Sequence, residues 1–358
     1  MTIARADRLP GRSPAGAGGG GGGGPGGRGA APRGRRRPPA AAPRGAPPRG
    51  AGAPPPGRRA GAARRGPRRS RLTASAFVAP LVVYLAAFYL YPLYRNLDLS
   101  LRHYTVRSFV AGDAPFSGWD NFAQVLDDPA FGPALRHTMV FTFVSIALQY
   151  TAGLALAVFF DRHFRLAATL RALFLVPWLL PLIVSASTWS WMLNSESGVV
   201  NYGLHLVGLP PVDWLTSPDR ALTSVIIANV WIGIPFNLVI LHSGLQNIPR
   251  ELYEAAALDG ASGRRQFWSI TFPLLRPVSA ITLLLGLVYT LKVFDLIWIM
   301  TKGGPGDSSS TLATWSYQLG FGTLLPQFGP GAAVGNLLVL IALVFGLLYI
   351  RVQRRQGA

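Results

Sequence analysis

The chain has 358 residues, of which 50% are hydrophobic and only 14% are charged, so its composition indicates an integral membrane protein rather than a globular one. The formal net charge of +19 is concentrated in the first 72 residues, which contain seventeen Arg and one acid. The absence of Cys excludes disulfides and thiolate chemistry, the five His are too far apart to predict a metal site, and neither of the two Lys lies in a Gly-rich phosphate-binding loop.

Residues 1–71 consist mainly of Gly, Pro, Ala and Arg, with almost no large apolar side chain. Such a segment cannot bury enough apolar surface to offset the entropy of ordering, and we expect a disordered tail. Its Arg clusters suit anionic lipid head groups at the inner face of a membrane. Nucleic-acid binding is the weaker alternative, because the tail has no aromatic residue on which bases could stack. We therefore expect membrane lipid, and no nucleic acid, as its partner.

Six apolar segments follow, each long enough for the roughly 20 residues that cross about 30 Å of hydrocarbon. In lipid they must be helical, because no water is available for unpaired backbone groups. The expected fold class is an all-α integral membrane protein with six transmembrane helices, in which Pro80, Pro177, Pro181 and Pro235 predict kinks. The predicted spans are Ala74–Tyr94, Met139–Phe160, Leu170–Leu193, Ala221–Leu241, Val278–Met300 and Ala333–Ile350.

The distribution of Arg and Lys between the connections predicts the orientation of these spans. The tail, the connection between the second and third spans, the connection between the fourth and fifth, and the C-terminus are all rich in Arg and fall on one side. The opposite connections are longer, and they carry six basic residues together with nine acids. By the positive-inside rule, we expect a multi-pass protein of the cell membrane with both termini in the cytoplasm.

One charged stretch, Glu251–Pro277, lies between the fourth and fifth predicted spans and is too polar to enter hydrocarbon. A short helix is expected from about Pro249 to Leu258, because Pro favours a first helical position and Glu251 places negative charge near the positive helix start. Asp259-Gly260 then supplies a stop, since Gly accepts the left-handed conformation that closes a helix.

A second helix is expected to follow this turn. Ser262 can cap its start, and Pro273 and Pro277, which cannot donate to a helical ladder, are expected to mark its end. The predicted product is a helix, a tight turn and a helix on the cytoplasmic side. Three small residues, Ala255, Ala256 and Ala257, would let a partner approach the first helix closely, while Glu254 and Asp259 remain available for charge pairing.

This stretch resembles the EAA loop of ABC importer permeases, in the form found in binding-protein-dependent sugar importers. The positions that carry the resemblance agree in order and spacing, and they are Glu254, Ala255, Ala256, Asp259, Gly260, Ala261, Phe267, Ile270, Pro273 and Pro277. Phe294-Asp295, Thr301, Gly303-Gly304-Pro305 and Thr311 further resemble the first permease subunit of maltose/glycerol-phosphate-type importers. The resemblance covers about residues 72–355, with the loop at about 244–277.

The resemblance implies a type I ABC importer permease fold and a non-enzymatic role. A second homologous permease, an ABC ATPase dimer and an extracytoplasmic solute-binding protein would be the partners. ATP and magnesium would be bound by the ATPase and no cofactor by this chain. The coupling role would fall on Glu254, Asp259 and Gly260, with the neighbouring Ala residues and Pro273 completing the motif, and the cargo would be a sugar or a related solute.

Four residues are candidates for the translocation pathway. Lys292 and Asp295 lie three apart in the fifth predicted span, so on one helix they would share a face and could pair. Trp231 could stack on a sugar ring and Asn237 could hydrogen-bond cargo. For all four, helix packing or anchoring at the membrane interface is the alternative.

Two other functional classes remain open at this stage. A secondary transporter would be driven by an ion gradient and is expected to contain buried carboxylates near the membrane midplane, for which Asp295 is the one candidate. A non-transporting membrane scaffold would use the basic tail to recruit partners. A secondary transporter would give the loop Glu251–Pro277 no function.

Overall fold

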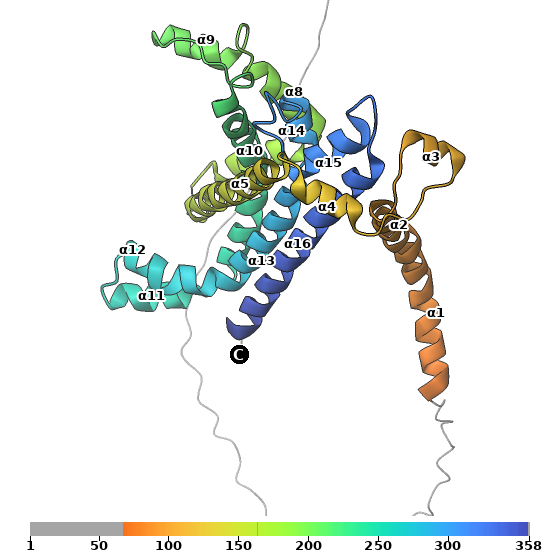
Figure 1. Ribbon diagram of the computed structural model, residues 1–358. Helices are drawn as coiled ribbons and strands as arrows, with labels where there is room; N and C mark the ends of the chain where they lie inside the picture. Colours follow the sequence, from red (N-terminus) through yellow and green to blue (C-terminus); the bar gives the residue numbers. More distant parts are fainter. Residues whose placement is uncertain (1–66, 163, 357–358) are drawn as a thin grey trace, which may run out of the picture. The chain divides into compact units, whose positions relative to one another are not determined.

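The computed structural model describes residues 67–162 and 164–356, and these form an all-helical unit (Figure 1). The tail predicted over residues 1–71 lies largely outside this part, although helix α1 begins at Pro67, inside the predicted tail. The helices are α1 (Pro67–Leu85), η1 (Ala86–Leu90), α2 (Tyr91–Ser100), α3 (Val106–Ala111), α4 (Asp120–Asp127), α5 (Phe131–Phe160), α6 (Ala167–Phe174), α7 (Val176–Leu179), α8 (Leu182–Met192), α9 (Val199–Leu206), α10 (Pro218–Gln246), α11 (Arg250–Leu258), α12 (Gly263–Gln266), η2 (Phe267–Thr271), α13 (Phe272–Leu291), α14 (Asp295–Met300), α15 (Leu312–Phe321) and α16 (Phe328–Gln356), where η denotes a π-helical turn.

Six membrane-crossing segments are consistent with this structure. Five helical stretches are long and apolar enough to cross a membrane, and a sixth crossing is formed if the bent pair α6–α7 and α8 is counted as one span. The unbroken stretches are Ala76–Ser100, Phe131–Phe160, Pro218–Gln246, Gly263–Leu291 and Phe328–Arg351. Each predicted span overlaps one of these six segments.

The third predicted span is sharply broken. Its two halves meet at an angle of 94°, between Leu179 and Leu182. Leu180 adopts an extended conformation before Pro181, which disfavours a helical conformation at the preceding residue and lacks the N–H that would continue the ladder. The kink predicted at Pro181 is therefore a break.

The fifth predicted span was wrong at both ends. It begins at Gly263 and ends at Leu291, so Pro273 and Pro277 lie within one long helix and do not mark the end of a separate one. The π turn η2 precedes them, and Phe272 donates its N–H to the carbonyl of Phe267 five residues earlier. This wider turn accommodates Pro273, which lacks an N–H, without ending the helix.

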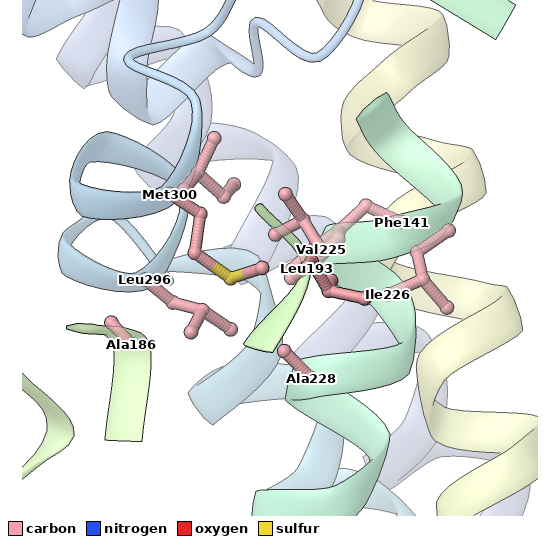
Figure 2. Packing of buried hydrophobic residues seen from close by; sticks show 9 residues of the cluster. Phe141, Ala186, Leu193, Val225, Ile226, Ala228, Leu296 and Met300 are labelled. Atoms are coloured by element: carbon pink, nitrogen blue, oxygen red, sulfur yellow. The ribbon is translucent and has the colours of Figure 1, made fainter. Parts of the chain in front are cut away.

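Helices α5 and α10 lie side by side and form the centre of the described unit. Gly153 on α5 allows this approach, because a Cβ added there would lie 2.5 Å from Cβ of Asn237 and 3.1 Å from the backbone nitrogen of Leu238. One buried cluster connects α5 and α10 with α8 and α14; Figure 2 shows Phe141 and Val225 close to Leu193, with Leu296 and Met300 facing them from α14. Small residues at helix crossings are the usual means of close packing in membranes.

We expect Gly153→Ala to destabilise the protein by about 1–3 kcal/mol, because part of the obstruction is backbone that cannot move aside. The measurement is thermal unfolding of the purified permease in detergent. Gly132→Ala is the matched control, since a Cβ at Gly132 on the same helix meets nothing within 4 Å. Equal melting temperatures for the two variants would contradict the proposed packing.

Candidate coupling loop

The candidate site begins with α11, a nine-residue helix that follows α10 after a three-residue connection. Pro249 adopts φ −58° and ψ 132° and immediately precedes the helix, one position earlier than its expected place as the first helical residue. Glu251 lies in the first turn, where a carboxylate favourably meets the positive end of the helix dipole. The short helix predicted from about Pro249 to Leu258 is therefore present at almost these bounds.

The helix ends in the turn that the sequence predicted. Gly260 has φ +75°, a conformation that is costly for residues with a Cβ. Its N–H donates to the carbonyl of Ala257 at 3.0 Å, and that of Ala261 donates to the carbonyl of Ala256 at 2.9 Å. This pair of bonds is the Schellman closure, which satisfies carbonyls that the helix end would otherwise leave unpaired.

Two side-chain hydrogen bonds attach the helix that follows, one to α11 itself and one to the turn after it. The hydroxyls of Tyr253 and Thr271 lie 2.9 Å apart, and Gln266 donates its side-chain amide to the carbonyl of Ala261 at 3.1 Å. Ser262 occupies the N-cap position before α12, as predicted, but its side chain makes no capping hydrogen bond. Tyr253 and Thr271 were not singled out from the sequence, because no local pattern pairs residues 18 positions apart.

The remaining residues of the motif are distributed between an exposed face and an attached face. Glu254, Ala255 and Asp259 are exposed, whereas Ala256 and Ala261 are half-buried. Leu258 is 90% exposed at the end of α11, so its apolar side chain is accessible from solvent. Pro273 is not on this face, because it lies at the second position of α13 within the next span.

Lys292 and Asp295 do not form the predicted pair. The helix ends at Leu291 and restarts at Asp295, so the two residues do not share a face of one helix, and both are exposed. Within the described residues, no ion pair joins them; the ammonium of Lys292 lies 5.1 Å from the ring centre of Tyr289. The assumption of a continuous helix to Met300 caused this error.

Trp231 and Asn237 lie on α10, the helix that precedes the coupling loop. Trp231 is partly exposed and meets Trp189 edge to face at 5.9 Å, whereas Asn237 is buried and donates to the carbonyl of Gly233 on its own helix at 2.9 Å. Asn237 therefore packs against Gly153 in this structure. Among the described residues, no group of three His, Cys, Asp or Glu could hold a metal ion.

The structure also brings together a series of rings that the sequence could not assemble. Phe236 contacts Trp178 and Tyr289 at ring-centre distances of 6.0 Å each, and these rings come from three separate helices. Trp178 and Tyr289 are about half-exposed. Their aromatic type was visible in the sequence, but their proximity depends on helix packing.

The described residues form an all-helical unit with up to six candidate membrane crossings, which is the architecture of a multi-pass membrane protein. The chain belongs to the family described as binding-protein-dependent transport system inner membrane component, whose model matches residues 149–357. It is a multi-pass inner-membrane permease subunit of a binding-protein-dependent ABC importer, and it is not the ATPase. ABC permeases bind no cofactor themselves. This membership assigns the chain to importers rather than to secondary transporters or scaffolds.

Curated relatives cover most of the chain. The trehalose/maltose transport system permease protein of Thermococcus litoralis is 37% identical over 280 residues, which is 77% of this chain and 92% of that protein. The sulfoquinovosyl glycerol transport system permease protein of Agrobacterium fabrum is 32% identical over 79% of this chain and 91% of its own length. The lactose transport system permease protein of Rhizobium radiobacter is 34% identical over 76% and 91%.

A solved structure shows the same fold. A chain of a bacterial ABC transporter involved in the import of the acidic polysaccharide alginate is similar with a TM-score of 0.69. The match covers 80% of this chain and 96% of that chain at 23% sequence identity. The likeness therefore supports the helical architecture described above.

We expect Gly260→Val to lower ATP-dependent uptake by about tenfold, because the left-handed conformation costs a β-branched residue at least about 1–2 kcal/mol. The added side chain meets nothing within 4 Å, so the strain is in the backbone and not in a clash. Gly263→Val is the matched control, since Gly263 is also in open space but lacks the positive φ. Gly260→Asn should retain most uptake, and equal activity of the three variants would contradict the turn's role.

Proposed function

We propose that this permease forms half of a pathway for a sugar, an oligosaccharide or a related solute, and that α11 is where a separate ATPase moves it. The observation that carries the proposal is the exposed α11, which is closed by Gly260 and tied to the next span through Tyr253 and Thr271. A force on α11 would reach the span Gly263–Leu291 directly, because α12, η2 and α13 run on without a break.

The exposed face of α11 suits a protein partner. Small residues allow close approach, Glu254 and Asp259 offer carboxylates, and the side chain of Leu258 offers apolar area that is otherwise exposed to solvent. Closure of an ATPase dimer on ATP would displace this helix and bias the permease between outward-open and inward-open states. Glu254, Asp259 and Gly260 are the residues to which we assign coupling.

Cargo of the sugar class is supported by the relatives and by the aromatic rings. The three curated relatives described above are permeases for trehalose/maltose, sulfoquinovosyl glycerol and lactose. Flat rings offer apolar faces to the C–H groups of a sugar, and Trp231, Trp178 and Tyr289 are each at least one-third exposed. We assign these three rings, rather than the buried Asn237, to cargo contact.

A second, homologous permease is the partner that we propose within the membrane. Of the span Ala76–Ser100, only Ser100 is buried in this chain, and the span meets the rest mainly where α2 contacts α16. There, Asn96 donates to Asn336 at 2.8 Å. The remaining faces of this span are available to the second permease and to lipid. From the distribution of Arg and Lys between the connections, we further propose that both chain ends are cytoplasmic and that the binding protein lies on the outer side.

Reconstitution tests this function directly. The chain is placed in liposomes with its second permease, its ATPase and the solute-binding protein, and uptake of radiolabelled maltose, trehalose and lactose is measured. We expect uptake of at least one sugar that requires ATP and persists when an ionophore collapses ion gradients. Sugar uptake that continues without the ATPase would contradict the proposal, and ATP-driven uptake restricted to solutes unrelated to sugars would contradict the cargo assignment.

A further inference from the structure

A cavity of about 950 Å³ lies behind the coupling loop. It is open to solvent on one side and is lined by the end of α5, the connection from α5 to α6, the start of α6, the end of α10, and the loop segments α11, α12 and η2. Its volume is within the range of pockets that hold small ligands. None of the three rings that we assign to cargo contact, Trp178, Trp231 and Tyr289, lines it.

The cavity is strongly basic. Four arginines line it against one carboxylate, and these residues are Arg162, Arg165, Arg171, Arg250 and Asp161. In the part of the chain that the structure describes, Arg162, Arg165 and Arg171 form no ion pair with a carboxylate. Excess positive charge without carboxylate partners is the usual electrostatic basis of anion recognition.

Arg171 supplies a second, independent observation. Its side chain is half-buried, and its Nε is fully enclosed without a hydrogen-bond partner. One terminal nitrogen of Arg171 lies 3.0 Å from Nε2 and 3.2 Å from Nδ1 of His242. Both distances start from the same nitrogen, so the contact with the imidazole ring is not bidentate. A guanidinium has five N–H donors, so the enclosed Nε–H of Arg171 is a donor that a bound anion could satisfy.

The position of the cavity along the helices and its apolar lining indicate which kind of anion it could bind. The ends of α5 and α10 and the starts of α6 and α12 line it, and these are the ends of candidate membrane-crossing segments. In the orientation that we propose, the ends of these segments meet the phospholipid head groups of the inner leaflet. Its apolar lining includes Phe164, Leu245 and Phe267. Basic pockets between membrane helices on the inner side are suited to anionic head groups.

We infer that this cavity binds a phosphate group, carried by an anionic phospholipid or by a soluble phosphate. Arg162, Arg165 and Arg171 receive the anion, and Arg250 and Tyr253 of α11 also line the cavity. The bound phosphate bridges the α5–α6 connection and the first helix of the coupling loop. Its effect on transport rests on the proposed function of α11, whereas the binding itself does not.

Photolabelling of the assembled importer in nanodiscs tests the inference without ATP. The probes are photoactivatable phosphatidylglycerol and phosphatidylcholine, and labelled peptides from residues 158–171 and 242–271 are quantified. Restricting the measurement to these peptides excludes label captured by the Arg-rich tail. The test variant is Arg162→Gln with Arg165→Gln, two exposed residues whose replacement leaves the buried packing intact. The control is Arg264→Gln with Arg265→Gln, also exposed and outside the cavity lining.

We expect phosphatidylglycerol to label these peptides more than phosphatidylcholine, with labelling about fivefold weaker for each arginine removed in the test variant and unchanged in the control. Competition by inorganic phosphate would identify a soluble phosphate as the ligand, and its absence would identify the lipid. Equal labelling by the two lipids without competition by phosphate, or equal loss in both variants, would overturn the site. Such a result alongside intact ATP-driven uptake would leave the importer function standing.

Discussion

Hydrocarbon provides no water for backbone groups, and this constraint determines where the helices of the chain can be interrupted. The helices that cross the membrane are interrupted at Pro181, and the fifth of them ends before Lys292–Phe294, whereas the two π turns lie within continuous helices. After Pro181, the N–H groups of Val184 and Ser185 both return to its carbonyl, at 2.9 and 3.1 Å. Long helices with a few well-closed breaks can move as rigid bodies, which is what alternating access requires.

The proposed coupling role requires the loop to be attached firmly to a span. A polar helix beside the membrane can transmit force only if it is attached to a span, and Tyr253 makes that attachment through Thr271 at the base of the span Gly263–Leu291. Gly260 sets the direction in which the chain returns to that span. The basic cavity lies between α11 and the ends of α5 and α10, so an anion there would stiffen the same attachment.

The sequence predicted features that depend on local chemistry. Apolar length located six spans, and Asp259-Gly260 located the left-handed turn, because only Gly adopts that conformation at little cost. It did not predict the break after Leu291, since apolar composition continues to Met300 and a break depends on which carbonyls find partners in the fold. The ring series around Phe236 and the lining of the cavity come from several helices, and no local pattern encodes their proximity.

The central claim is that α11 meets the ATPase, and the exposed Leu258 allows a direct measurement. The chain has no Cys, so Leu258→Cys introduces its only thiol, to which a photoactivatable maleimide can be attached. Leu324→Cys is the control, because Leu324 is fully exposed and lies between the fifth and sixth spans, on the side that we assign to the exterior. Crosslinking of the ATPase from position 258 and not from position 324 is the predicted result. No ATPase adduct from position 258 in the assembled importer, or equal adducts from both positions, would contradict the account.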